Sequence, residues 1–212
     1  MPQYPKDETR DRIRTAALKE FATRGYAASS MAAIAKTAGV ATGNIYTYFP
    51  NKDALFRDVV PDEFAKAVTR LLRARVKALS GVTDVRTLEP GAPYRVISEE
   101  LLRFCIENRF RMVVLLAKAE GTEHARFADE TVDQLVKLAL LHARSIGKAP
   151  KFTRSLRFAL DRIYRNFVTA MVDTLATFDD EQELRAAVAH ISDYHLAGMK
   201  MLFETSPQTE AV

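Results

Sequence analysis

Residues 29–52 read SSMAAIAKTAGVATGNIYTYFPNK, and they predict two short helices joined by a tight turn. Ser29 or Ser30 can accept a hydrogen bond from an exposed amide at a helix N-terminus, and apolar residues then recur at helical spacing. Gly39 follows the last of these residues, at the place where a left-handed C-cap favours a residue without Cβ. Thr42 is the expected N-cap of the second helix.

The second of these helices has two different faces. Ile45 and Phe49 are four residues apart and share one face, which is expected to pack inward. The opposite face is polar and aromatic, and it carries no carboxylate that would repel phosphate. A helix-turn-helix that lays its second helix in the major groove of DNA needs an anchoring face and a reading face of this kind.

Four longer motifs run in order through residues 9–60: F-x-x-x-G-Y, I-A-x-x-A-G-V, G-N-I-Y-x-Y-F and N-K-x-x-L-F. In this order and spacing they resemble the DNA-binding domain of TetR-family transcriptional regulators, over roughly the first quarter of the chain. The resemblance implies an all-α fold with an N-terminal helix-turn-helix domain of three helices, residues 1–60. It also implies that residues 61–212 form a larger helical domain for effector binding and dimerisation.

Residue chemistry and the resemblance together give the expected DNA contacts. Asn44 is the only outward residue of the second helix with the paired donor and acceptor that suits an adenine edge. This helix has no Arg or Lys, which excludes bidentate readout of guanine from it, so sequence choice is expected to depend on Asn44, apolar contacts and DNA shape. The full expected set is Ser30, Thr42, Gly43, Asn44, Tyr46, Thr47, Tyr48 and Lys52.

The composition, 48% apolar and 27% charged, is that of a soluble globular protein. The longest apolar run, Met112–Ala117, is far shorter than the ~20 residues of a membrane helix, and the N-terminus lacks the apolar core of a signal peptide. We therefore expect a cytoplasmic protein with no membrane partner. Residues 1–60 hold nine Lys and Arg against six Asp and Glu, whereas the rest of the chain holds 22 against 21. The basic excess coincides with the helix-turn-helix, as phosphate binding requires.

Two long amphipathic helices are expected at the C-terminus, over residues 153–178 and 180–204. Each has an apolar stripe at steps of three and four residues, which favours a helix pair that packs against its symmetry mate. The resembling family dimerises there, through a four-helix bundle. The expected interface residues are Leu175, Val188, Ile191, His195, Gly198, Met199 and Leu202. Gly198 either lets two helices approach closely or is merely tolerated.

Apolar residues of the larger domain are interpreted in two ways. The favoured interpretation of each single residue is that it belongs to the ordinary core. The other interpretation is that the residues together line an effector cavity for a hydrophobic or amphipathic small molecule. The set is Phe104, Met112, Phe127, Phe158, Phe167 and Met171. Arg103, Arg109 and Arg111 flank this region, and solvated surface charges are favoured over carboxylate binders.

The sequence supports no catalysis. It contains no phosphate loop, nucleophile elbow or dinucleotide fingerprint, and its four histidines are not spaced as metal ligands, so no cofactor and no metal site are predicted. Two function classes remain. The favoured one is a ligand-responsive, homodimeric repressor that a small molecule releases from a palindromic operator on double-stranded DNA. The alternative is a helical small-molecule-binding or scaffolding protein without specific DNA binding.

Overall fold

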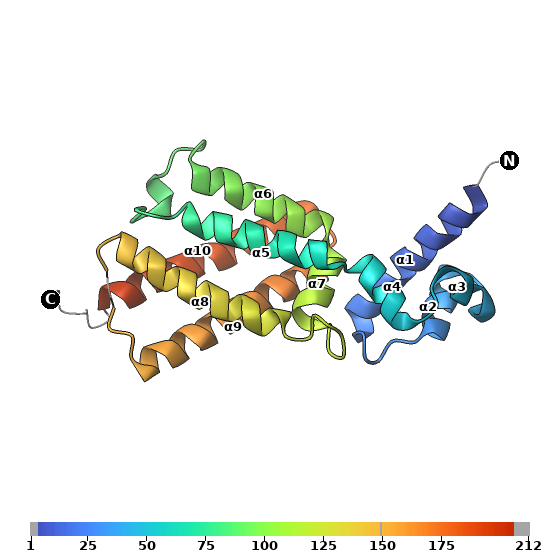
Figure 1. Cartoon of the computed structure of the whole chain (residues 1–212). Helices are drawn as coiled ribbons and strands as arrows, with labels where there is room; N and C mark the ends of the chain where they lie inside the picture. The colour runs from blue at the N-terminus through green and yellow to red at the C-terminus, as the bar shows by residue number, and fades with distance from the viewer. Residues whose placement is uncertain (1–3, 149, 206–212) are drawn as a thin grey trace. The chain divides into compact units, whose positions relative to one another are not determined.

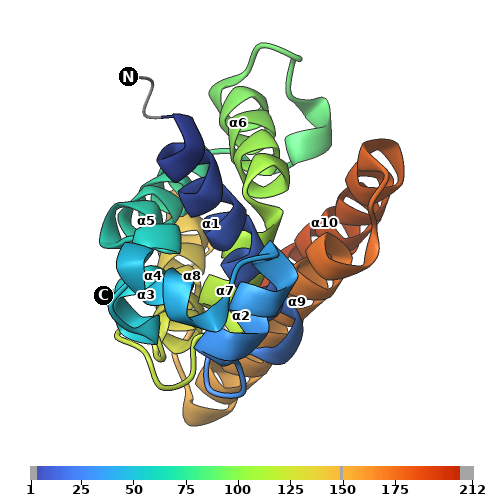
Figure 2. The same cartoon turned by 90° about the vertical axis from the view of Figure 1, so that its right-hand side faces the viewer.

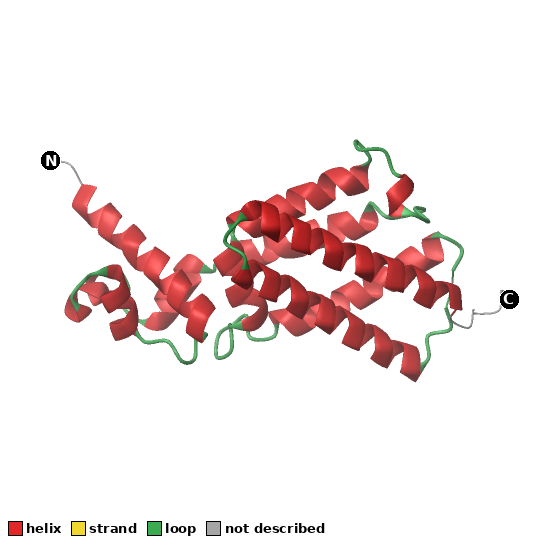
Figure 3. Ribbon diagram, turned by 180° about the vertical axis from the view of Figure 1, so that it is seen from behind, coloured by secondary structure: helices red, strands yellow, loops and turns green. Residues whose placement is uncertain are grey.

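The computed structural model describes residues 4–148 and 150–205, and the regular elements in these ranges are helices without a strand among them (Figure 3). This confirms the prediction of an all-α fold. Within the same ranges no helix is long and apolar enough to cross a membrane. The helices are α1 (Tyr4–Arg24), α2 (Met31–Ala38), α3 (Thr42–Tyr48), α4 (Lys52–Val59), α5 (Asp62–Lys77), α6 (Pro93–Glu107), α7 (Arg109–Ala117), α8 (Phe127–Ser145), α9 (Arg154–Thr177) and α10 (Glu181–Thr205), with a 3-10 turn at Val85–Thr87 (Figure 1).

The chain folds into two compact units. The first comprises Met1–Lys66 and Asn108–Ala128, and the second comprises Ala67–Glu107 and Asp129–Val212. The first unit is larger than the domain expected over residues 1–60, because α7 and the loop after it pack with the N-terminal helices. The Tyr26 amide donates to the Lys118 carbonyl at 2.9 Å. Assigning DNA binding to residues 1–60, and effector binding and dimerisation to residues 61–212, stays a prediction.

The core of the first unit comes from the apolar stripes of α1 to α4. Six of its residues, which come from α1 to α3 and the loops that follow α1 and α3, are all buried: Ile13, Phe21, Tyr26, Ile34, Ile45 and Phe49. Phe56 on α4 is also buried, and its ring centroid lies 5.7 Å from that of Phe21 and 5.1 Å from that of Tyr26. Apolar burial of this kind fixes α2 and α3 against α1 and α4.

An ion-pair network joins α1 to α4. Arg14 donates to Asp58 through Nε at 2.5 Å and through a second guanidinium nitrogen at 3.0 Å, and Arg10 donates to the same carboxylate at 3.0 Å. The hydrogen bond from Arg14 is the main cause that lowers the pKa of Asp58, and burial acts in the opposite direction. This bidentate pairing holds α4 against α1.

The core of the second unit lies where α8, α9 and α10 meet. Helices α9 and α10 lie side by side (Figures 1 and 2). The buried cluster consists of Val132, Leu135, Val136, Ala139, Ala143, Leu156, Leu160, Tyr164, Met199 and Phe203. The apolar stripes of the two C-terminal helices are therefore used in part within the protomer, against α8.

Two helices begin elsewhere than their sequence suggests. Asp7 or Thr9 could cap the first helix, but α1 already begins at Tyr4. The break at Gly121 would let a helix begin at Glu123, but α8 begins at Phe127, because the preceding residues form turns: the Thr122 hydroxyl donates to the Ala119 carbonyl at 2.7 Å.

Candidate nucleic-acid interface and ligand cavity

Local hydrogen bonds hold α2 and the turn after it. The Ser30 hydroxyl accepts from the Ala33 amide at 3.1 Å, which confirms the predicted N-cap. Gly39 has a φ of 66°, and its amide donates to the Lys36 carbonyl at 3.1 Å. The Arg12 guanidinium of α1 donates to the carbonyl of Ala38 at 2.6 Å. These contacts fix the angle at which α3 leaves α2.

Replacing Gly39 by alanine is expected to lower the free energy of unfolding by about 1–2 kcal/mol. The residue is in the left-handed region, and an added Cβ would lie 2.8 Å from a guanidinium nitrogen of Arg12. The matched control is Gly43→Ala, where an added Cβ meets nothing within 4 Å. Denaturant unfolding of both variants checks the prediction, and an equal cost at the two positions would contradict it.

Helix α3 has the two faces that the sequence predicted. Ile45 is buried beneath it, and Phe49, its C-cap residue, is buried as well. The outward residues are exposed: Thr42, Gly43, Asn44, Tyr46 and Thr47. Tyr48 is half-buried at the flank, and Ser30 is exposed at the start of α2. The exposed face of α3 carries hydroxyl, amide and phenol groups and no acidic side chain.

The N-cap prediction for α3 was wrong. Ala41 is the N-cap residue and makes no side-chain capping bond, while Thr42 is already the first helical residue. The helix can start without a polar cap because the burial of its own residue Ile45 against the neighbouring helices stabilises it. The Thr42 hydroxyl is therefore not used as a cap and lies at the exposed end of the reading face.

Lys52 is held within the protein. Its ammonium group donates to the carbonyls of Tyr26 at 2.8 Å and of Ser29 at 2.9 Å, and it lies 4.2 Å from the centroid of the Tyr26 ring. Three intramolecular partners compete with the phosphate contact expected at this position. The structure thus gives Lys52 a role in fixing the loop between α1 and α2 against α4. Asn51, a residue type that favours helix N-termini, caps α4 and accepts from the Ala54 amide at 2.8 Å.

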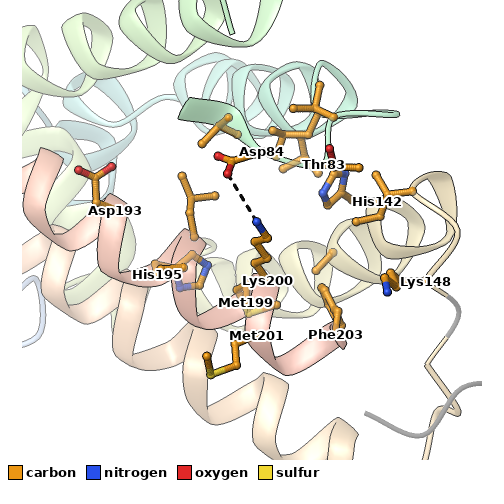
Figure 4. A pocket seen from close by; sticks show the side chains of 18 of the residues that line it. Thr83, Asp84, His142, Lys148, Asp193, His195, Met199, Lys200, Met201 and Phe203 are labelled. Carbon is orange, nitrogen blue, oxygen red and sulfur yellow. Dashed lines mark hydrogen bonds and ion pairs between the residues drawn. The ribbon is translucent and has the colours of Figure 1, made fainter. Parts of the chain in front are cut away.

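The second unit contains a cavity of about 710 Å³, which lies in the size range of small-molecule sites (Figure 4). Its lining comes from α5 and the loop after it, from α8 and the residues just after it, and from α9 and α10. Most of the lining is apolar, and Figure 4 shows Asp84 and Lys200 paired at its edge, 3.5 Å apart.

Only one of the six residues expected to line an effector cavity reaches this one. Phe167 lines it, whereas Met112 and Phe127 are buried in the first unit. Phe158 is 67% exposed, because it lies on the side of α9 opposite to the buried cluster. Phe104 and Met171 are half-buried and do not line the cavity. Of the flanking arginines, Arg111 donates to the Val59 carbonyl at 2.8 Å in the first unit.

Several polar side chains that were not expected at an effector site line this cavity, and three of them are Arg75, His195 and Tyr164. Arg75 donates to the Ser98 hydroxyl at 3.1 Å and to the Tyr94 hydroxyl at 2.7 Å. Among the described residues no carboxylate lies within ion-pair distance of its guanidinium. His195 packs on the Phe167 ring, with centroids 4.2 Å apart, and burial and then the charge of Arg75 lower its pKa to about 4. Tyr164 is the third, and burial raises the pKa of its hydroxyl.

The expected dimer-interface residues occupy different places. Leu175 and Met199 are buried within the protomer, and His195 lines the cavity. Val188, Ile191 and Leu202 are half-buried, and Gly198 is exposed. The large apolar side chains that α10 leaves exposed are Tyr194, at 83%, and Met201, at 67%. The residues that sequence periodicity selected lie on the side of α10 that packs within the protomer. The two exposed residues lie on the opposite side and were not predicted.

Comparison with known proteins places the chain in a family. Residues 13–59 match the profile described as bacterial regulatory proteins, tetR family. The chain is 42% identical over 206 residues to the HTH-type transcriptional regulator AcrR of Shigella flexneri, covering 89% of this chain and 90% of that protein. It is 37% identical over 162 residues to the uncharacterized HTH-type transcriptional regulator YuxN of Bacillus subtilis, covering 74% of this chain and 52% of the relative.

The chain spans about half the length of two of its relatives, YuxN at 52% and YdgC of Bacillus subtilis at 48%. A solved structure, a TetR-like transcriptional regulator from Rhodococcus sp. RHA1, shares the fold with a TM-score of 0.50 and 24% identity over 94% of this chain and 98% of that one. The 42% identity that extends along 90% of AcrR, together with the match over residues 13–59, shows that this chain belongs to the TetR family of bacterial regulatory proteins.

Proposed function

We propose that this protein is a homodimeric transcriptional repressor that binds a palindromic operator on double-stranded DNA through α3. The observation that carries the proposal is the exposed face of α3, from Thr42 to Thr47, which has groups for base and phosphate contacts and no carboxylate. The buried Ile45 beneath it and the fixed turn at Gly39 give this face a defined orientation for the major groove.

A two-fold dimer presents two copies of α3 to the same side of a duplex. The half-sites must then lie about 34 Å apart, which is one helical turn, or a multiple of it. The exposed side of α10 with Tyr194 and Met201 supports dimerisation through the two C-terminal helices, because an isolated protomer gains nothing from exposing two large apolar groups there. A ligand that prefers one dimer geometry would change DNA affinity by shifting the population of geometries.

The salt dependence of duplex binding tests the DNA-binding function. We expect fluorescence anisotropy to show an affinity loss of about a thousandfold between 50 and 200 mM salt, because each neutralised phosphate releases counterions. No binding even at low salt would contradict the proposal and favour the helical small-molecule-binding or scaffolding protein.

The effector of this proposed repressor is an amphipathic molecule with an anionic head group. The cavity of about 710 Å³ is largely apolar, which suits a hydrocarbon or aromatic body. Its partly buried Arg75 has two hydroxyl partners and lacks a carboxylate partner in the described part of the chain. A carboxylate of the ligand would supply the missing counter-charge in a bidentate pair.

A series of ten-carbon probes tests this head-group preference. Decanoate is expected to bind more tightly than decanol or decylamine in titration calorimetry, since only decanoate neutralises Arg75. Arg75→Gln should remove the preference by weakening decanoate about tenfold while leaving decanol unchanged. Arg73→Gln, an exposed position on the same helix, is the matched control. Equal decanoate binding by the two variants would exclude Arg75 as the partner of the head group.

A further inference from the structure

We infer that Asp62, Glu123 and His124 form a binding site for a divalent transition-metal ion of the Zn²⁺ type. The three side chains come from two segments of the first unit. Asp62 is the first residue of α5, and Glu123 and His124 lie in the loop between α7 and α8. One ligand atom from each of the three residues lies within 4.8 Å of the other two. This site is separate from the cavity and does not rest on the proposed function.

His124 is the observation that points to a ligand. The residue is 8% exposed, and its Nε2 atom is buried without a hydrogen-bond partner in the part of the chain that the structure describes. The ring is held between Phe56 and Phe127, with centroid distances of 6.2 and 6.5 Å. These contacts aim Nε2 at the Asp62 carboxylate, 3.5 Å away, without forming a hydrogen bond. A buried polar atom left without a partner costs free energy, and a bound cation would remove this cost.

The spacing of the donor atoms suits coordination. Two ligands at 2.0–2.1 Å from a tetrahedral ion lie about 3.3–3.4 Å from each other. The 3.5 Å between His124 Nε2 and the Asp62 oxygen is close to this value. Asp62 and Glu123 are exposed, so their carboxylates can rotate toward the ion. Their open side leaves a fourth position for water, as at zinc sites with three protein ligands.

The ligand types decide which ions fit. One imidazole with two carboxylates suits Zn²⁺, Co²⁺ and related transition metals, whereas Mg²⁺ and Ca²⁺ prefer oxygen donors alone. Arg57 on α4 opposes cation binding, because its Nε lies 3.3 Å from a Glu123 oxygen. This contact therefore offers a variant with the opposite effect, because removal of the positive charge of Arg57 should raise the affinity of the site for a cation.

An ion at this position would join the start of α5 to the loop after α7. Asp62 comes three residues after Val59, where α4 ends, and α4 directly follows the segment that carries the reading helix. The contact would therefore stabilise the first unit and hold the end of α4 and the start of α5 in one arrangement.

Titration of the full-length protein with Zn²⁺, after chelation and desalting, tests the inference. We expect one ion per chain in calorimetry and a d–d absorption band when Co²⁺ is added. Asp62→Asn and Glu123→Gln should each weaken Zn²⁺ binding at least about tenfold, since even loss of a group that only supports a ligand has an effect of this size. Both positions are exposed, so these variants test the site without disturbing the core as a His124 variant would.

Glu63→Gln and Glu120→Gln are the matched controls, because each removes one exposed charge next to the cluster in sequence without changing a ligand. Arg57→Gln is expected to bind Zn²⁺ more tightly than the unaltered protein. Failure to bind Zn²⁺ or Co²⁺ at one equivalent would overturn the inference. Equal affinity in the ligand and control variants would also overturn it, since the ion would then be bound by other histidines.

Discussion

Replacement of Phe56 by alanine is expected to lower the free energy of unfolding by about 3–5 kcal/mol. The side chain is 2% exposed, and its ring contacts those of Phe21, Tyr26 and His124. Truncation removes this burial and leaves a cavity at the point where α1, α4 and the loop after α7 meet. The two units need not unfold together, so the loss should be read from a probe in the first unit as well as from total helicity.

The control for Phe56→Ala is Phe152→Ala, an equal truncation at an exposed position before α9. It is expected to cost less than about 1 kcal/mol. Both variants should be unfolded in denaturant at the same protein concentration, because dimerisation would contribute to the apparent stability. Equal costs at the two positions would show that Phe56 does not organise the core of the first unit.

Replacement of Asn44 by alanine is expected to weaken operator binding by roughly 5- to 150-fold, the effect of losing one bidentate base contact. Asn44 is the only exposed residue of α3 with an amide side chain, and the helix has no Arg or Lys that would take over its contact. The loss should be confined to operator DNA, while binding to unrelated duplexes, which depends on phosphate contacts, should change little.

Asn166→Ala, at an exposed position of α9, is the matched control and is expected to leave DNA binding unchanged. Competition between the operator and single-base variants of it measures the discrimination directly. If Asn44→Ala retained the full preference of the parent protein for its operator, base readout through Asn44 would be excluded and DNA shape would have to account for specificity.

Local signals in the sequence predicted the helix-turn-helix well. The cap at Ser30, the left-handed Gly39 and the cap at Asn51 each depend on a few adjacent residues. The burial of Ile45 beneath α3 follows from a single helical periodicity. The role of Lys52 was missed because its partners, the carbonyls of Tyr26 and Ser29, become neighbours only through the fold.

The second unit was harder to predict for a physical reason. Helices α9 and α10 carry apolar residues on more than one side, so periodicity alone does not tell which side packs on α8 and which lies at the surface. Phe158, Tyr194 and Met201 are exposed although they are as apolar as the buried residues of the same helices. The cluster of Asp62 with His124 was also invisible to spacing rules, since the two residues are brought together from distant segments.

Selection of bound sequences from a random duplex library, at near-physiological salt, tests the central proposal of a specific dimeric regulator. We predict enrichment of a palindrome whose half-sites lie about one helical turn apart, or a multiple of it, as two copies of α3 related by a two-fold axis require. Recovery of no common motif, with binding that disappears as salt rises, would contradict the proposal and leave only nonspecific electrostatic contact with DNA.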